Sequence, residues 1–297
     1  MQSNLIINEV KKLVELLRWN KPSGRLILLI PAGWSLWLTP STPPSAKLLT
    51  LILAGGVLIS GAGCVANDLW DRKIDKHVKR TKNRPLATDP SKVVSASALL
   101  FTTLALSLLV VFCLPIAGRA ITLGLAITSL PAILLYPSTK RWFKLPQAVL
   151  AFCWGFAVLI PWAASEANLQ GGWPLIGCWV ATVTWTFGFD TVYALADRRD
   201  DQRLGLNSSA IFLGQNVLKV VSLSYFSTSI FICIAALFAG VSWIFWPFWL
   251  IASVGMQREA WILKTYFHVP AIYGKHFKNQ VLLGGFILLG LISSRLN

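Results

Sequence analysis

Residues 48–75 read LLTLILAGGVLISGAGCVANDLWDRKID, an apolar run that ends in a short cluster of acidic side chains. The run from Leu48 to Ala66 is long enough to cross most of a hydrocarbon core of about 30 Å as a helix. Backbone amides inside a membrane must be satisfied within their own segment, and the run lacks the alternation of a barrel strand. The stretch therefore predicts a transmembrane helix with an acidic tip.

The composition extends this prediction to the whole chain. Hydrophobic residues make up 55% and charged residues 13%, whereas a soluble domain carries about 25% charged residues. We predict an all-α polytopic membrane protein, in which about nine transmembrane helices form one bundle with a central cavity that opens to the cytoplasmic side. The prediction of a span is weakest for the eighth, residues 242–260. The predicted spans are residues 24–42, 48–66, 93–114, 118–136, 146–164, 173–195, 217–239, 242–260 and 279–295.

The regions outside the spans predict a simple domain organisation. Residues 1–22 carry charges among apolar residues at helical spacing, which is typical of an amphipathic segment on a membrane surface, and no signal peptide is expected. Residues 23–297 then form a single transmembrane domain. Residues 261–278 are predicted to be a loop. We assign no role to the three histidines, which are predicted to lie in loops: His77, His268 and His276.

Basic residues predict the orientation of the bundle. Lys47, Arg119 and Arg295 lie on one side of the predicted topology, and the other Lys and Arg residues lie on the side of the N-terminus. The positive-inside rule places the N-terminus in the cytoplasm. The net charge of +15 then reflects orientation and contact with anionic lipids. Nucleic acid is not an expected partner, because no segment could form a basic soluble module. The expected location is the cell inner (plasma) membrane, with a thylakoid membrane as the alternative.

A second acidic cluster follows the sixth span, where residues 190–201 read DTVYALADRRDD. Carboxylates are costly at a membrane boundary, so their concentration there indicates a function. The two clusters hold seven of the twelve carboxylates in the chain: Asp68, Asp71, Asp75, Asp190, Asp197, Asp200 and Asp201.

Helical spacing places the acidic side chains of each cluster on one face. In the first cluster the positions i, i+3 and i+7 are Asp68, Asp71 and Asp75, and Asn67 joins them. In the second cluster the positions i, i+3, i+7 and i+11 are Asp190, Tyr193, Asp197 and Asp201. Mg²⁺ prefers such hard oxygen ligands and is commonly held by carboxylates together with substrate phosphates. We therefore predict a site for divalent cations between two facing helix tips.

Basic residues beside the clusters extend this prediction to a polyanion such as a diphosphate. These basic residues are Arg72, Lys73, Lys79, Arg80, Lys82, Arg84, Lys140, Arg141, Lys144, Arg198, Arg199 and Arg203. Among them we take Arg72, Lys140 and Arg198 as candidate phosphate partners, because guanidinium and ammonium groups bind phosphate oxygens. Two roles remain open for Arg18 and Lys21, contact with the diphosphate or with lipid headgroups, and we favour headgroups. Solvated helix caps are the simplest alternative. A cation-coupled transporter and a non-catalytic lipid-binding protein also remain open, although a transporter should have more acidic residues as deep as Asp190.

The two acidic patterns resemble the motifs of a known family. The residues Asn67-Asp68-x-x-Asp71-x-x-x-Asp75 are similar to the first motif, NDxxDxxxD, of the UbiA superfamily of intramembrane aromatic prenyltransferases. Asp197-x-x-x-Asp201 is similar to the second motif, DxxxD. Within that superfamily, four segments resemble the 4-hydroxybenzoate polyprenyltransferases, whereas HVPAIYGKHF at 268–277 looks inserted. The four segments are residues 18–38, 67–86, 136–147 and 190–214.

The resemblance implies Mg²⁺-dependent transfer of a polyprenyl group from polyprenyl diphosphate to the ring of 4-hydroxybenzoate, ortho to the hydroxyl. The reaction would serve ubiquinone or plastoquinone biosynthesis, and another aromatic acceptor such as homogentisate is the alternative. The implied metal ligands are Asn67, Asp68, Asp71, Asp75, Asp197 and Asp201. The implied catalytic residues are Asp71, Asp75, Asp190, Asp197 and Arg141, with Arg141 facing the acceptor carboxylate. Asp190 would orient the acceptor phenol or take a proton, and a hydrogen bond to a neighbouring helix is the equal alternative. The implied substrate-binding residues are Asn67, Arg72, Tyr136, Lys140, Tyr193 and Arg198.

Overall fold

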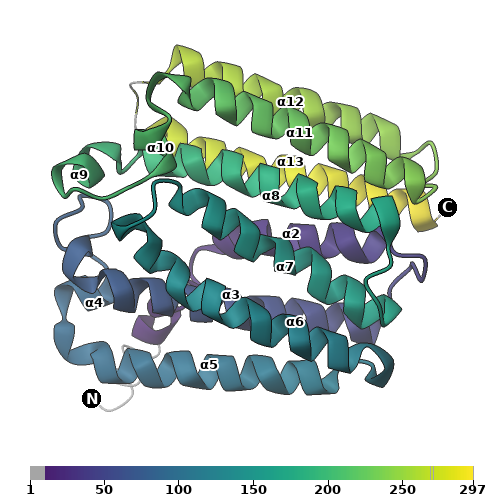
Figure 1. Ribbon diagram of the computed structural model, residues 1–297, viewed down its shortest axis with the longest axis horizontal. Coiled ribbons are helices and arrows are strands. Elements are labelled where there is room, and N and C mark those ends of the chain that lie inside the picture. Colours follow the sequence, from purple (N-terminus) through teal and green to yellow (C-terminus); the bar gives the residue numbers. More distant parts are fainter. Residues whose placement is uncertain (1–10, 268, 270, 297) are drawn as a thin grey trace.

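The computed structural model describes residues 11–267, 269 and 271–296. This part of the chain consists of helices joined by turns and loops (Figure 1). Nine long helices within it account for the nine predicted spans, so the all-α prediction is confirmed. Their bounds are α2 Pro22–Leu38, α3 Ala46–Asp75, α5 Val93–Cys113, α6 Ile116–Leu135, α7 Pro146–Glu166, α8 Gly172–Leu195, α11 Val217–Phe238, α12 Phe245–Thr265 and α13 Ala271–Leu296.

Among the described residues, seven helices are long and apolar enough to cross a membrane. The other two long helices are α2 and α12. Helix α2 has 17 residues, which is the lower limit for a span. The second half of α12 carries Gln257, Arg258 and Glu259, which lower its hydropathy.

The long helices lie side by side and alternate in direction (Figure 1). As a result, α3 and α8 both end at the left side of Figure 1, which we call the acidic end of the bundle. Short helices connect the long ones in the sequence. They include α4 Pro85–Thr88, η1 Pro90–Lys92, η2 Tyr136–Arg141, α9 Arg198–Arg203, α10 Ser209–Phe212 and η3 Gly214–Asn216. At the opposite end, Arg295 Nη2 donates to the Ala239 carbonyl over 2.7 Å, where free carbonyls of a helix C-terminus favour a cation.

Glycines allow two pairs of helices to approach closely. A Cβ added at Gly118 of α6 would lie 2.2 Å from the Ala163 carbonyl oxygen of α7. A Cβ at Gly177 of α8 would lie 2.7 Å from the Phe231 carbonyl oxygen of α11. Small residues at such crossings are a general feature of packed membrane helices.

Two tryptophans join α2, α8 and α13 at the centre of the bundle. The rings of Trp34 and Trp185 lie 5.0 Å apart between centroids, and both side chains are fully buried. Trp34 Nε1 donates to the Gly284 carbonyl over 3.0 Å, and Trp185 Nε1 donates to Gln280 Oε1 over 2.9 Å. The N–H groups of these two buried indoles therefore both have a hydrogen-bond partner.

Residues 1–10 of the predicted amphipathic segment lie outside the described residues. Residues 11–16 are helical, and Leu16 is buried in a small apolar cluster with Val65 of α3 and Leu86 of α4. The described part of this segment therefore packs on the acidic end of the bundle.

The second acidic cluster differs from its predicted geometry. Helix α8 ends at Leu195, and a turn separates it from α9, which begins at Arg198. The prediction that Asp190 and Asp201 share one continuous helix face is therefore wrong. The first cluster does lie on one helix, because α3 continues through Asp75.

The predicted loop 261–278 is also wrong over much of its length, because α12 extends to Thr265 and α13 begins at Ala271. His268 lies outside the described residues. His276 is fully buried in α13, and its Nε2 lies 2.6 Å from the hydroxyl of Tyr225.

Candidate active site

A cavity of about 620 Å³ extends from the acidic end into the bundle. One face of α3 lines it from Leu51 to Asp75, a rise of about 36 Å at 1.5 Å per residue. Its wall is polar at the acidic end and apolar farther in, where α2, α5, α6 and α7 contribute leucine, isoleucine and valine side chains. The predicted central cavity is thus present, and it combines a charged mouth with an apolar interior.

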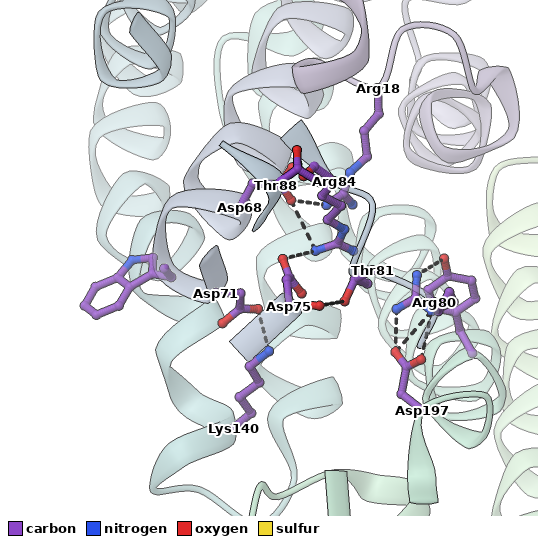
Figure 2. A network of polar contacts seen from close by, with 12 residues as sticks. Arg18, Asp68, Asp71, Asp75, Arg80, Thr81, Arg84, Thr88, Lys140 and Asp197 are labelled. Atoms are coloured by element: carbon purple, nitrogen blue, oxygen red, sulfur yellow. Dashed lines mark hydrogen bonds and ion pairs between the residues drawn. The ribbon is translucent and has the colours of Figure 1, made fainter. Parts of the chain in front are cut away.

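The carboxylates of α3 are buried, with 1% of Asp68 and 3% of Asp75 exposed. Both contact arginines from other segments, as Figure 2 shows. Arg18 Nη2 lies 2.5 Å from Asp68 Oδ1, and Arg84 Nη1 lies 3.2 Å from the same oxygen and 2.9 Å from Asp75 Oδ2. Buried carboxylates require such partners. Of the two roles predicted for Arg18, the favoured one at lipid headgroups is therefore wrong, because Arg18 contacts Asp68 and lines the cavity.

The third carboxylate of α3, Asp71, contacts the segment η2. Lys140 Nζ lies 2.5 Å from its Oδ2, and Arg141 Nη2 lies 3.2 Å from its Oδ1. Arg141 also donates to the carbonyl oxygens of Trp70 over 2.9 Å and Pro137 over 3.1 Å. These backbone contacts fix the guanidinium of Arg141 on the outer side of Asp71.

The loop after α3 contacts the second acidic cluster. Arg80 Nε donates to Asp197 Oδ1 over 2.9 Å, and Arg80 Nη1 donates to the hydroxyl of Tyr193 over 2.7 Å (Figure 2). The backbone N–H of Lys79 donates to Asp200 Oδ2 over 2.8 Å. These bonds join the loop after α3 to the second acidic cluster, and residues of both clusters line the same cavity.

Two hydrogen bonds close the polar end of the cavity on the side of η2 and α7. The backbone N–H of Asn207 donates to the Lys140 carbonyl over 2.8 Å, and that of Ser209 donates to Gln147 Oε1 over 2.7 Å. The segment after α9 is thereby fixed beside Lys140.

Most of the predicted site residues line the cavity, and four do not. Those that line it are Asn67, Asp71, Asp75, Tyr136, Lys140, Asp190, Tyr193, Asp197 and Asp201. Those outside its described lining are Asp68, Arg72, Arg141 and Arg198. Arg72 donates to the Leu69 carbonyl of its own helix. Neighbouring helical residues point about 100° apart, which separates Arg72 from Asp71.

Sequence reasoning did not select several residues of the site, although Arg80 and Arg84 belong to the basic set beside the first cluster. Arg80 and Arg84 line the cavity beside the acidic groups, and Phe277 and Lys278 line it from the first turns of α13. The basic loop after α3 gave a signal for the arginines, because a cation cluster beside carboxylates fits phosphate binding as well as orientation. HVPAIYGKHF gave no signal for a helix at the cavity.

Burial and charge alter the titration of two groups outside the spans. Burial and the nearby Asp197 raise the pKa of Asp201 to about 7, although Lys140 and Arg80 oppose the shift. Burial lowers the pKa of Arg80, but its hydrogen bonds to Asp197 outweigh this and hold the pKa above its ordinary value. Arg80 is therefore a permanent cation at the mouth of the cavity.

The oxygen donors suit a divalent cation in type, but basic side chains separate them. Among residues 11–267, 269 and 271–296, no three His, Cys, Asp or Glu side chains lie close enough together to hold a metal ion. Asp71, Asp75 and Asp197 contact Lys140, Arg84 and Arg80 instead. The donor chemistry fits Mg²⁺. A bound Mg²⁺ would replace the basic side chains as the partner of these carboxylates.

Residues 28–271 match the UbiA prenyltransferase family. This chain belongs to that family. A 4-hydroxybenzoate solanesyltransferase of Synechocystis sp. is 41% identical over 282 residues, which are 94% of each chain. A 4-hydroxybenzoate octaprenyltransferase of Citrobacter koseri is 32% identical over 307 residues, with 99% of each chain covered.

Solved UbiA structures share the fold. A UbiA homolog from Aeropyrum pernix K1 superposes with a TM-score of 0.76 at 22% identity, covering 90% of this chain and 97% of that one. A UbiA homolog from Archaeoglobus fulgidus bound to GPP and Mg²⁺ superposes with a TM-score of 0.66 at 18% identity, covering 95% and 99%. This UbiA family member is a multi-pass integral membrane protein.

Proposed function

We propose that this protein transfers a polyprenyl group from a polyprenyl diphosphate to the ring of 4-hydroxybenzoate, at the carbon ortho to the hydroxyl. The observation that carries the proposal is one cavity with two chemical environments. Its mouth presents carboxylates and cations from both acidic tips, and its interior is apolar. A donor with a charged diphosphate and a long hydrocarbon tail matches both parts. The names of relatives at 32–41% identity support 4-hydroxybenzoate as the acceptor.

Mg²⁺ is the metal that fits the donor set. The ligands we propose are the oxygen-bearing residues that line the mouth, namely Asn67, Asp71, Asp75, Asp197 and Asp201. Mg²⁺ bound there would neutralise the charge of the leaving diphosphate. The homolog bound to GPP and Mg²⁺ supports this assignment. Asp68 lies outside the cavity lining, so we assign it to holding Arg18 and Arg84 rather than to the metal.

Basic residues at the mouth would bind the diphosphate. Lys140, Arg80 and Arg84 line the cavity and already contact carboxylates. Phosphate oxygens can replace those carboxylates as partners, which leaves the carboxylates free for the metal. Fixed cations stabilise negative charge as the bond from the prenyl carbon to the diphosphate breaks. In this proposal Arg80 and Arg84 take the phosphate-binding role that the sequence assigns to Arg72 and Arg198, which lie outside the described cavity lining.

The acceptor would bind deeper, beside Asp190. The aromatic rings of Tyr193 and Phe277 lie 5.4 Å apart, and that of Phe189 lies 5.5 Å from Phe277. Asp190 and these three rings line the cavity, so a flat phenol can pack there with its hydroxyl toward Asp190. The carboxylate of Asp190 would orient this hydroxyl or accept a proton. Tyr136 lines the same region.

Arg80 lies at the cavity wall, with its guanidinium carbon 4.6 Å from the centre of the Tyr193 ring, and is assigned to the diphosphate alone. Arg141, which is predicted to face the acceptor carboxylate, is assigned instead to fixing Asp71. The apolar cavity also excludes water, which would otherwise capture the prenyl cation.

The cellular setting follows from the substrates and the charge distribution. We propose that the acidic end and the N-terminus face the cytoplasm, in a cell inner membrane or a thylakoid membrane, because most basic residues lie on this side. The product would enter ubiquinone or plastoquinone biosynthesis.

A transfer assay tests the proposal. Purified protein in lipid vesicles receives radiolabelled 4-hydroxybenzoate and a polyprenyl diphosphate, with Mg²⁺ or with EDTA. We expect a prenylated product with Mg²⁺ and none with EDTA. A parallel reaction contains homogentisate. Product from homogentisate alone would show that homogentisate, and not 4-hydroxybenzoate, is the acceptor. No product with any acceptor or donor length would refute the proposal.

A further inference from the structure

Among the described residues, three basic side chains that line the cavity lack an acidic partner. The cations contributed by the loop after α3 and by η2 each contact a carboxylate. Arg25 of α2 and Lys278 of α13 also line the cavity, but within residues 11–267, 269 and 271–296 neither side chain has an ion-pair or hydrogen-bond partner. Lys21, just before α2, is the third. Like charges that face one cavity repel each other, so an anionic ligand would stabilise them.

Helices α2 and α13 both begin at the acidic end, and their register places Arg25 and Lys278 at the same depth. A Cβ added at Gly284 of α13 would lie 3.2 Å from Ile30 Cγ2 of α2, so these two residues are neighbours. Arg25 precedes Ile30 by five residues, a rise of about 7.5 Å. Lys278 precedes Gly284 by six residues, a rise of about 9 Å. The two cations therefore approach the cavity from adjacent helices at one level.

Lys278 lies directly beside the aromatic wall of the cavity. It follows Phe277, whose ring lies 5.4 Å from that of Tyr193 and 5.5 Å from that of Phe189. The cations proposed for the diphosphate belong to other elements, the loop after α3 and η2. Lys278 is thus placed on the side of the cavity where the acceptor phenol would pack.

The direction of the helices fits the two ends of this acceptor. Each Cα–Cβ bond of a helix tilts toward the helix N-terminus, so the side chains of Arg25 and Lys278 lean toward the mouth. Asp190, the proposed partner of the phenol hydroxyl, lies within α8 below the mouth. Hydroxyl and carboxylate occupy opposite ends of the 4-hydroxybenzoate ring. With the hydroxyl at Asp190, the carboxylate points back toward the mouth.

Space for a ligand exists next to Lys278. Gly274 lies one turn earlier on the same face of α13 and lines the cavity as well. A Cβ added at Gly274 would meet no atom within 4 Å among its described neighbours. The absence of a side chain there leaves room for a carboxylate beside the ammonium of Lys278.

We propose that Lys278 and Arg25 bind the carboxylate of the acceptor and thereby select acidic phenols over neutral ones. The inference rests on the proposed transfer function and identifies the residues that determine its acceptor specificity. The guanidinium of Arg25 offers two parallel N–H donors to a carboxylate, and the ammonium of Lys278 adds a point charge. Both residues bind the acceptor at the end remote from the carbon that is prenylated.

The test compares 4-hydroxybenzoate with methyl 4-hydroxybenzoate, which keeps the phenol but carries no charge. Geranyl diphosphate and Mg²⁺ are the same in both reactions. The variants are Lys278→Gln, Arg25→Gln, Lys278→Arg and Gly274→Leu. Lys275→Gln is the matched control, because Lys275 is an exposed lysine of the same helix outside the described cavity lining. Lys278 and Gly274 are exposed too, and Tm confirms that each variant is folded.

We expect the wild type to favour the acid. Lys278→Gln and Arg25→Gln should each lower the ratio of kcat/KM for the acid to that for the ester about tenfold or more, since a hydrogen bond to a charged group is lost. The loss should appear in KM for the acid, and Lys278→Arg should recover most of it. Gly274→Leu should raise KM for both acceptors by filling the space. The control should keep the wild-type ratio.

Three results would overturn the inference. They are a wild type that uses the ester as well as the acid, an unchanged ratio in either glutamine variant, and loss of the Tm shift caused by Mg²⁺ and geranyl diphosphate in Lys278→Gln. The last result would assign Lys278 to the diphosphate.

Acceptor binding distinguishes failure of this inference from failure of the proposed function. Binding of radiolabelled 4-hydroxybenzoate to the purified protein, with Mg²⁺ and without donor, needs no transfer. If the wild type makes no product yet binds the acid, loss of binding in both glutamine variants still supports the inference. If the wild type makes product and both variants bind the acid as it does, the function stands and the inference is refuted.

Discussion

Arg80, in the loop that follows α3, donates from Nε to Asp197 Oδ1 over 2.9 Å and connects the two acidic segments of the chain. The same guanidinium donates to Tyr193 of α8 over 2.7 Å. Segments more than a hundred residues apart in sequence therefore meet at one cavity mouth, and a single side chain contacts both the acidic turn and the aromatic wall. This relationship is the structural basis for treating the two acidic clusters as one site.

Replacement of a carboxylate in either cluster should abolish transfer. We expect Asp71→Ala and Asp197→Ala each to lower kcat/KM about a hundredfold or more, as when a group that stabilises developing charge is removed. Asp89→Ala is the matched control, because Asp89 is a surface carboxylate paired with Lys92. Full activity in either cluster variant would remove that residue from the proposed site.

Arg80 should contribute to binding the diphosphate. We expect Arg80→Ala to weaken donor binding about 10- to 100-fold, since a hydrogen bond to a charged group is lost. Arg80→Lys should recover only part of this, because an ammonium cannot reproduce the guanidinium fork. The measurement is KM for geranyl diphosphate, with exposed Lys82→Ala as the control. An unchanged KM in Arg80→Ala would exclude the role.

Asp190 should act on the acceptor rather than on the donor. It lines the cavity within α8, below the charged mouth. We expect Asp190→Asn to lower kcat or raise KM for 4-hydroxybenzoate, while the Tm shift caused by Mg²⁺ and donor stays at the wild-type value. Loss of donor binding in this variant would instead assign Asp190 to the diphosphate.

A buried polar cluster outside the cavity should stabilise the fold. The hydroxyl of Tyr225 lies 2.6 Å from His276 Nε2, and Glu259 Oε2 lies 3.4 Å from His276 Nδ1. His276→Ala leaves both partners without the imidazole, which should lower the free energy of unfolding by about 1–3 kcal/mol. Thermal unfolding in detergent measures the change. His77→Ala, at an exposed position, should have no effect.

The first acidic cluster and the long helices could be predicted from sequence because their signals are local. Apolar runs of membrane length specify seven of the nine long helices among the described residues, and Asp68, Asp71 and Asp75 lie on one helix, as their spacing predicts.

The second cluster could not be predicted because tertiary contacts decide it. The residues ALADRRDD contain no Pro or Gly, so nothing local marks the turn at Asp197. Its geometry follows from bonds to Arg80 and to the backbone N–H of Lys79. Similarly, a basic loop has the same composition whether it orients the bundle or contacts a site. The partnership of Arg84 with Asp75 appears only when the chain folds back.

The start of α13 shows a further limit of sequence patterns. Charged and aromatic residues in HVPAIYGKHF suggested a loop, yet Ala271 begins a helix of 26 residues. Within this stretch, His276 is buried and its Nε2 lies 2.6 Å from the hydroxyl of Tyr225 on α11. A single sequence does not reveal such partners.

The central claim is that both acidic tips hold Mg²⁺ and a diphosphate together. The most direct measurement is the Tm shift caused by Mg²⁺ with geranyl diphosphate in the wild type, Asp71→Asn and Asp197→Asn, with Asp89→Asn as the control. Ligand at a hundredfold excess over Kd should stabilise the wild type and the control by about 2.7 kcal/mol. The account predicts that both cluster variants lose this stabilisation. Wild-type stabilisation in either one would contradict it.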